Sequence, residues 1–176
     1  ELGVTPDSYQ TLSHLVKKPQ GMILVTGPAG SGKTTTVCAA LRQLCSPGVN
    51  IATVEAPVEY MIGGANQIQV NTKTGMSFAD TLRSVLQHDP NVLMVGELPD
   101  GETAEIALKA AQNGHLVLTT ISSNDSAAAI ARLIELQLPG RLIADSITAV
   151  ISQRLVRKLC TCRKRIPATH EYREQL

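Results

Sequence analysis

Aromatic side chains are nearly absent from this sequence of 176 residues, which has no Trp, one Phe and three Tyr. Proteins that stack the bases of single-stranded nucleic acid need a surface of aromatic rings, so the composition argues against that class. A net charge of only +1 excludes a strong overall attraction to nucleic acid or to a membrane surface. The sequence also lacks an apolar run of about 18 residues and a signal peptide, so we expect a soluble, cytosolic chain.

Cysteine is also scarce, and its four copies do not follow the spacing of a secreted disulfide framework. Cys38 falls within a predicted helix and Cys45 at its end, and we expect both to act as small apolar residues. Cys160 and Cys162 are separated by one residue, and two interpretations of them are open. They are either an ordinary reduced pair or half of a zinc site, which would need four ligands and has no second pair downstream.

Short β-branched runs alternate with stretches of helical periodicity, and apolar residues make up 43% of the chain. The strand-like segments are residues 21–27, 50–56, 67–70, 91–97 and 115–121. The helix-like segments are residues 32–44, 77–88, 103–112, 124–138 and 141–159, with Ser77 as a candidate N-cap. This alternation predicts an α/β fold in which a mostly parallel, twisted sheet carries helices on both faces.

The two ends differ from the body, so we divide the chain into a helical or linker segment (1–19), a main domain (20–160) and a polar tail (161–176). The first segment is expected to pack onto the domain as a helix and to follow further sequence in a longer protein. Basic residues gather near the other end, where a nucleic-acid patch and a solvated or interfacial face are both open interpretations. These residues are Arg154, Arg157, Lys158, Arg163, Lys164 and Arg165.

The motif "GPAGSGKTTT" at residues 27–36 has the spacing of a phosphate-binding loop and stands between a predicted strand and a predicted helix. Its glycines let the backbone turn tightly with N–H groups pointing at phosphate oxygens, and the start of the helix adds its positive dipole end. Lys33 is expected to reach the β- and γ-phosphates, and the Thr34 hydroxyl suits Mg²⁺. The predicted nucleotide-binding residues are Gly27, Pro28, Ala29, Gly30, Ser31, Gly32, Lys33, Thr34 and Thr35.

Glu97 ends the apolar run "LMVGE", at the carboxyl end of a predicted strand where parallel sheets bind their ligands. An acid at this place beside a phosphate loop is expected to hold Mg²⁺ together with Thr34 and to orient or deprotonate the attacking water. The alternative is a plain carboxylate at the end of a strand.

These residues lie within a longer pattern that resembles the motor ATPases of type II secretion and type IV pilus assembly. Four stretches carry the resemblance: "GPAGSGKTTT", "TVEAPVEY", "LMVGELPDGETAEIA" and "NGHLVLTTISSND". The resemblance implies a RecA-like P-loop fold that binds ATP or ADP with Mg²⁺, and a separate N-terminal domain. It also implies a hexameric ring at the cytoplasmic face of the inner membrane, whose ATP hydrolysis drives a membrane platform protein.

Four acidic or titratable residues match positions that the resemblance makes catalytic. Glu55 and Glu59 match acids of the family's acidic box, Glu97 matches its second nucleotide motif, and His115 matches the histidine of its "GH" motif. For His115 two roles are open, sensing the γ-phosphate or capping a strand.

The sequence also departs from the family. Ala56 stands where an acid is usual, Gln87 and Pro99 where arginines are usual, and Ser122 where a histidine is usual. Because arginines spread charge in the transition state, their loss is expected to slow hydrolysis more than binding.

Two functions are therefore open: an ATP-hydrolysing motor domain, or a nucleotide-binding structural or regulatory subunit with weak or no hydrolysis. A third, a nucleic-acid motor of the RecA type, would need a DNA surface that the composition does not show, so no nucleic-acid partner is expected.

Overall fold

Six strands, all paired in parallel, form one sheet in the order β3-β2-β4-β5-β1-β6 in a computed structural model that describes residues 3–71 and 75–164. The strands are β1 (Gly21–Thr26), β2 (Ile51–Glu55), β3 (Ala65–Gln69), β4 (Val92–Val95), β5 (Leu116–Ile121) and β6 (Ile147–Ser152). The helices are α1 (Pro6–Leu15), α2 (Lys33–Leu44), α3 (Phe78–Leu86), α4 (Gly101–Gln112), α5 (Ser126–Glu135) and α6 (Gly140–Ser146). The predicted α/β fold with a parallel sheet is confirmed.

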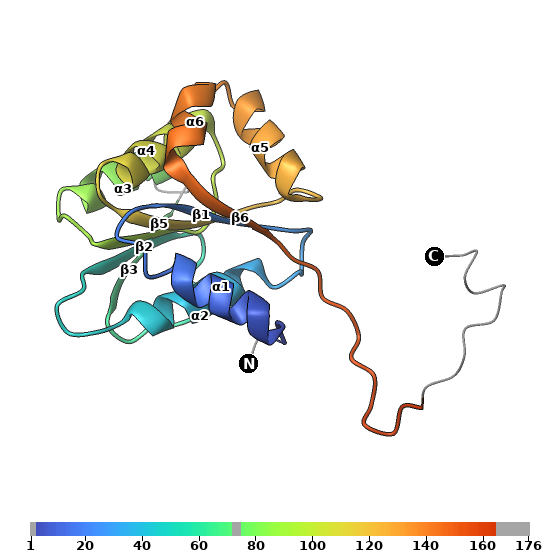
Figure 1. The fold of residues 1–176 in the computed structure, drawn as a ribbon. Helices are drawn as coiled ribbons and strands as arrows, with labels where there is room; N and C mark the ends of the chain where they lie inside the picture. The colour runs from blue at the N-terminus through green and yellow to red at the C-terminus, as the bar shows by residue number, and fades with distance from the viewer. Residues whose placement is uncertain (1–2, 72–74, 165–176) are drawn as a thin grey trace.

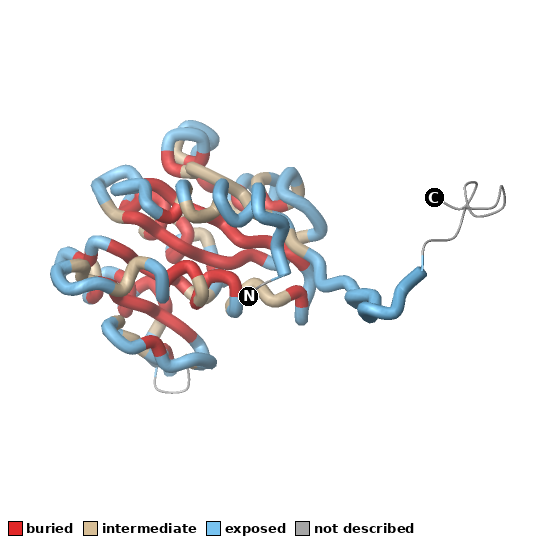
Figure 2. The backbone as a smooth tube through the Cα atoms, turned by 60° about the horizontal axis from the view of Figure 1, so that its bottom comes forward, coloured by how far each residue is buried: buried red, intermediate tan, exposed pale blue. Residues whose placement is uncertain are grey.

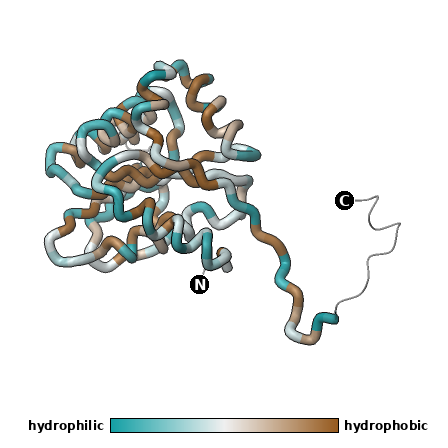
Figure 3. Tube along the Cα trace, in the orientation of Figure 1, coloured by the Kyte–Doolittle hydropathy of each residue, from teal (hydrophilic) through white to brown (hydrophobic). Residues whose placement is uncertain are grey.

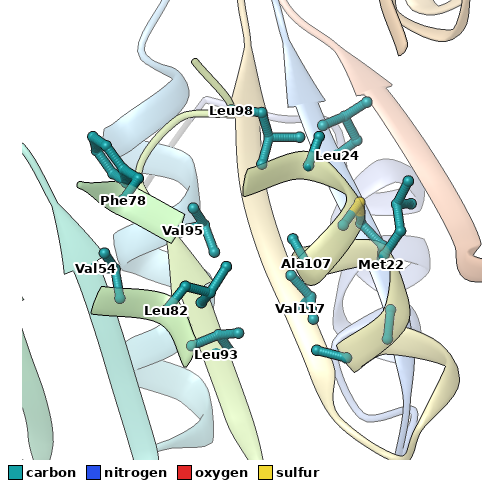
Figure 4. Close-up of a cluster of buried hydrophobic side chains, with 14 of the residues drawn as sticks. Met22, Leu24, Val54, Phe78, Leu82, Leu93, Val95, Leu98, Ala107 and Val117 are labelled. Carbon is teal, nitrogen blue, oxygen red and sulfur yellow. The ribbon is translucent and has the colours of Figure 1, made fainter. Parts of the chain in front are cut away.

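Helices cover both faces of the sheet, as the sequence predicted (Figure 1). One face packs against α3, α4, α5 and α6 through a core that includes Met22, Leu82, Leu93 and Ala107 (Figure 4). The other face packs against α2 and the end of α1 through a second, smaller core. The central strands β1, β2, β4 and β5 are buried along their whole length, which explains why they are continuous apolar runs (Figure 2).

The ends of the helices follow ordinary capping chemistry. The Ser77 hydroxyl accepts a hydrogen bond from the Asp80 N–H and caps α3, which confirms the predicted N-cap. Asp100 and Asp125 cap α4 and α5 in the same way. Capping by Asp100 starts α4 two residues before Thr103, where periodicity alone had placed it.

The helix predicted over residues 141–159 is wrong. Helix α6 ends at Ser146, and the chain continues as strand β6, which pairs with β1 from Met22↔Ile147 to Thr26↔Ser152. The apolar spacing that imitated a helix arises because β6 contributes to both cores. Ile147 and Val150 contact the first core, while Ile151 contacts the second. Four β-branched residues in this strand favour the extended form once β1 offers a free edge.

After β6 the chain leaves the body as an extended segment up to residue 164 (Figures 1 and 3). Leu155, Val156 and Leu159 are mostly exposed there. Cys160 and Cys162 are joined in a disulfide with a Cα–Cα distance of 5.3 Å, so the prediction of a reduced pair is wrong. A single intervening residue in a turn brings the two side chains within the separation that a disulfide spans. The predicted polar tail falls mainly on residues 165–176, outside the described residues, as does Arg165.

Candidate functional site

Parallel strands bring their carboxyl ends to one edge of the sheet, and the phosphate-loop motif lies at that edge. Residues 27–32 connect the end of β1 to the start of α2. Gly30 and Gly32 have φ angles of 73° and 83°, a left-handed conformation that residues with a Cβ adopt only with strain. Gly32 is the N-cap of α2 and has no side chain to bond the first N–H groups of the helix. The loop therefore presents backbone donors and a helix N-terminus at one point, as phosphate binding requires.

The Lys33 ammonium lies across this loop. Its Nζ donates hydrogen bonds to the carbonyl oxygens of Gly27 at 2.9 Å and Pro28 at 3.0 Å. Partial burial lowers the pKa of Lys33 from its ordinary value. The charge of Lys33 is thus held over the loop, where the β- and γ-phosphates of a nucleotide would lie.

Gln153 fixes the loop from the far side, and the sequence analysis missed this residue. Its backbone N–H donates to the Thr26 carbonyl at 2.9 Å, and its side-chain Nε2 donates to the Ser31 carbonyl at 2.6 Å. A Cβ on Gly27 would lie 2.6 Å from the Gln153 carbonyl oxygen and 2.4 Å from Ser31 Oγ. Gln153 was hidden because residues 141–159 were interpreted as a helix. The β-branched run directly before it was the available clue to a strand that ends beside the loop.

Strand β5 lies between the phosphate loop and the strand that carries Glu97. The Thr26 hydroxyl hydrogen-bonds to Ser123 just after β5, and the Thr120 hydroxyl donates to the Gly96 carbonyl at 2.8 Å. Ser122, one of the positions that departs from the family, is exposed in this same stretch. These hydroxyls tie the ends of β1, β5 and β4 into one edge.

Glu97 follows β4 at this edge and is exposed. Two strand spacings separate β1 from β4, about 10 Å in total. That distance leaves room for a triphosphate terminus and a water molecule between Lys33 and Glu97. Pro99, two residues further on, is exposed at the same edge.

Glu55 also ends its strand at this edge, but its carboxylate is buried and already engaged. Its Oε1 accepts hydrogen bonds from Thr53 Oγ1 at 2.6 Å and from Gln67 Nε2 at 3.1 Å. Glu55 therefore joins β2 to β3. Glu59, four residues later, is exposed. Burial raises the pKa of the Cys38 thiol on α2 to about 11, and the charges of Glu55 and Glu59 add to this rise.

His115 and Gln87 lie at the opposite edge. His115 precedes β5, and its Nδ1 hydrogen-bonds with the Pro90 carbonyl at 2.7 Å. The six residues of β5 separate it from the loop edge by about 20 Å. Gln87 ends α3 just before β4 and is exposed at that same far edge. Within one chain, the structure therefore places His115 and Gln87 at the edge of the sheet opposite the phosphate loop.

The oxygen donors at the loop edge suit a Mg²⁺ ion that is held partly by phosphates and waters. They do not suit a metal ion whose ligands all come from the protein. Among residues 3–71 and 75–164, no group of three or more His, Cys, Asp and Glu side chains could hold a metal ion. Mg²⁺ is usually held by one or two protein oxygens together with phosphates and waters. Thr34, half-buried in the first turn of α2, and the exposed Glu97 carboxylate are donors of this type.

None of the helices among the described residues combines the length and the apolar character that a membrane span requires.

Comparison with known proteins finds similarity to proteins of secretion and pilus machines. A family model described as "Type II/IV secretion system protein" matches residues 1–175. The "Type II secretion system protein HxcR" of Pseudomonas aeruginosa is 50% identical over 92% of this chain and 35% of its own length. The "Type IV pilus assembly ATPase PilB" of the same organism is 48% identical over 93% of this chain and 29% of its own. The chain thus spans about a third of the length of these relatives.

A solved structure described as "Crystal Structure of the Pilus Retraction Motor PilT and Bound ADP" has the same fold. It superposes with a TM-score of 0.73 at 34% identity, over 96% of this chain and 53% of the other. The fold of this chain is therefore the RecA-like P-loop fold that the resemblance implied.

Proposed function

The chain belongs to the family of type II/IV secretion system proteins, and we propose that it is the ATP-binding motor domain of a machine that secretes proteins or assembles pili. The observation that carries this proposal is the loop of residues 27–34, where Lys33, the glycine backbone and the start of α2 converge. Support for an adenine nucleotide comes from the ADP bound in the related pilus retraction motor.

In the proposed reaction, water attacks the γ-phosphorus of ATP, the bond to the β,γ-bridging oxygen breaks, and ADP and phosphate leave. The loop N–H groups and Lys33 bind and orient the phosphates. Glu97 orients the water and accepts its proton, and its exposed position two strands from the loop supports this role. Thr34 and Glu97 would hold Mg²⁺, which neutralises phosphate charge when bound. Glu59 is proposed to hold further water at the same edge, while Glu55 positions β3 through its hydrogen bond with Gln67.

A second candidate is a nucleotide-binding structural or regulatory subunit with weak or no hydrolysis. Three uncharged residues favour it: Ala56, Pro99 and Ser122 follow β2, β4 and β5 at the loop edge and are exposed there. None of them supplies a cation for the charge that develops on the γ-phosphate. Binding depends on other residues and would be retained.

The wider assembly is also a proposal. Since the family works in secretion and pilus machines, we propose that the whole protein forms a hexameric ring at the cytoplasmic face of the inner membrane. There it would act on a membrane platform protein. The names of the relatives support a role in these machines.

Calorimetry with Mg-ATP tests the binding site. Replacing Lys33 with Ala removes the charge that lies over the loop, so ATP affinity should fall at least tenfold, about 1.4 kcal/mol. Lys109→Ala is the matched control, because Lys109 on α4 pairs with Glu105 on the surface. Equal affinity in the Lys33 variant and the unmodified chain would contradict nucleotide binding at this loop.

A further inference from the structure

Strand β3 is the last strand on its side of the sheet, so its outer edge is open. Val70, directly after it, donates its N–H to the Glu55 carbonyl of β2, and successive backbone groups of a strand point to opposite sides. The N–H and carbonyl groups of Gln67 and Gln69 therefore point away from β2, and no strand among residues 3–71 and 75–164 pairs with them. Charged residues or proline usually protect such an edge, and β3 ("ANQIQ") contains neither.

A groove with a volume of about 750 Å³ lies between β3 and α3, and we name it the β3 groove. Asn66 and Ile68 line it from β3, and Ala52 lines it from β2. The α3 side of the groove is lined by Asp80, Thr81, Ser84 and Val85. Because α3 packs over β2, strand β3 extends beyond the helices on this face of the sheet, and Ile68 stays half-buried. An extended segment that pairs with β3 would place every second side chain in this groove.

The segment after β6 carries apolar side chains that are largely exposed to water. Leu155, Val156 and Leu159 are 70%, 86% and 68% exposed. This segment forms neither helix nor strand and leaves the body in an extended path (Figure 3). We name residues 155–159 the arm. Three exposed apolar side chains within five residues favour a contact that removes them from water.

The side chains of the arm match the β3 groove in their spacing. In an extended chain, alternate side chains lie on the same side, so Leu155, Arg157 and Leu159 share one side of the arm. With that side turned toward α3, the two leucines would contact the apolar residues Ile68 and Val85. The backbone of the arm would then be free to bond the open edge of β3.

The charges of the two surfaces are also complementary. On the α3 side of the groove, the Asp80 and Glu102 carboxylates share one cation, Arg83, which leaves a net negative charge. The Asp80 side chain is 71% exposed and lines the groove. The arm carries Arg157 and Lys158 and has no acidic residue. Opposite charges at the rim of a contact favour encounter and fix its register.

The arm does not reach the β3 edge of its own chain. Its start is held beside β1, because Gln153 bonds to Thr26 and Ser31, and Arg154 bonds to the Asn124 carbonyl. Five strand spacings separate β6 from β3, about 24 Å in total. The five residues of the arm span at most about 18 Å when fully extended. The matching edge must therefore belong to another molecule.

We propose that the arm of one copy of this chain binds the β3 groove of a second copy. The arm backbone pairs with Gln67 and Gln69, and Leu155 and Leu159 enter the groove. Since arm and groove are different surfaces, the contact is heterologous, and each copy can give its arm to one neighbour and its groove to another. The contact would add to the ring proposed above for the whole protein. It needs no nucleotide, so its failure would leave the proposed motor function untouched.

Two complementary variants test this contact by nuclear magnetic resonance. The arm variant, Leu155→Ser/Val156→Ser/Leu159→Ser, keeps the groove. The groove variant, Asn66→Lys/Ser84→Lys, keeps the arm and places cations at two exposed groove positions, where they repel the basic arm. Unlabelled groove variant, added at up to about 1 mM to the ¹⁵N-labelled arm variant, should shift the Gln67 and Gln69 amide signals and slow their solvent exchange at least about twofold. Unlabelled arm variant added to the same sample should shift neither signal.

A matched control replaces an exposed residue away from both surfaces. Gln112→Lys, at the end of α4, keeps arm and groove, so this variant should shift the β3 amides of the labelled arm variant as the groove variant does. In the unmodified chain, the same amides should shift with protein concentration, which gives a test that does not depend on a variant folding. Unchanged Gln67 and Gln69 signals in that dilution series would overturn the proposal. Shifts confined to other elements, such as α5 and α6, would overturn it as well, because the arm would then bind elsewhere.

Discussion

At the scale of single residues, the loop edge divides into groups that hold phosphate and groups that could act on it. Lys33 is positioned by hydrogen bonds to two loop carbonyls. Glu97 is exposed, and its proposed role is to act on the water and the Mg²⁺ that bind beside it. This difference predicts that substitutions at the two positions have different effects on binding and on rate.

Glu97→Gln should remove ATP hydrolysis while ATP affinity stays within a few-fold. Glutamine keeps the size and hydrogen bonding of the side chain but cannot accept the proton of the attacking water. Phosphate release and calorimetry on the same preparation measure the two effects. Glu105→Gln on the exposed surface of α4 is the control, and hydrolysis that survives in the Glu97 variant would remove Glu97 from the mechanism.

Pro99→Arg should raise the rate of ATP hydrolysis, because it places a cation at the loop edge, where developing charge on the γ-phosphate needs one. Gln87→Arg should leave the rate unchanged, because position 87 lies at the far edge of the sheet. The sequence alone predicts that the loss of the arginines at positions 87 and 99 slows hydrolysis. A rate increase in the Gln87 variant, measured in the monomeric chain by phosphate release, would show that the placement of this residue is misjudged.

At the scale of helices and strands, most of the fold was predictable because apolar runs and helical periodicity are local properties. Strand β6 was not predictable. The apolar residues among 147–151 have a spacing that fits a helix as well as a strand with both faces buried. Only the unpaired edge of β1 decides between them, and a sequence pattern does not show that edge.

The site was predictable to the same extent. The phosphate loop and Glu97 follow their strands and meet at one edge, as expected for a parallel sheet. His115 and Gln87 precede their strands, so the direction of those strands takes them to the other edge. A motif match does not show at which edge of the sheet a residue lies, because that depends on whether the residue precedes or follows its strand. Gln153 could be found only after β6 was known.

Gln153→Ala should lower the free energy of unfolding by about 1–2 kcal/mol, because the Ser31 carbonyl loses its donor. It should also weaken ATP binding several-fold, since the loop is then held less firmly. Urea unfolding and calorimetry measure these effects. Gln112→Ala, at the exposed end of α4, is the control, and the prediction fails if both variants behave alike.

At the scale of the whole molecule, the chain spans about a third of the length of its relatives, and the ring is proposed for the whole protein. We propose that the groups at the loop edge of this chain are enough to bind Mg-ATP. They include few cations to stabilise the transition state.

The 176-residue chain alone should therefore hydrolyse ATP at less than ~0.1 s⁻¹, below the common enzyme range of about 1–10³ s⁻¹. Steady-state phosphate release measures the rate, and light scattering on the same sample should show a monomer or weak association at micromolar concentration. Hydrolysis at several per second by a monomer would rule out the structural-subunit alternative.

The path of the chain after β6 has a mechanical consequence. The segment from residue 154 onward departs from the sheet at the loop edge (Figure 1). The residue before it, Gln153, is bonded to Thr26 directly before the phosphate loop and to Ser31 within the loop. Tension applied to that segment along the strand would load the parallel β1–β6 ladder in shear, with all its hydrogen bonds sharing the force. A sideways pull would instead separate the two strands from this end, and after the bond from Arg154 to the Asn124 carbonyl the next bonds to break would be those of Gln153 that hold the phosphate loop.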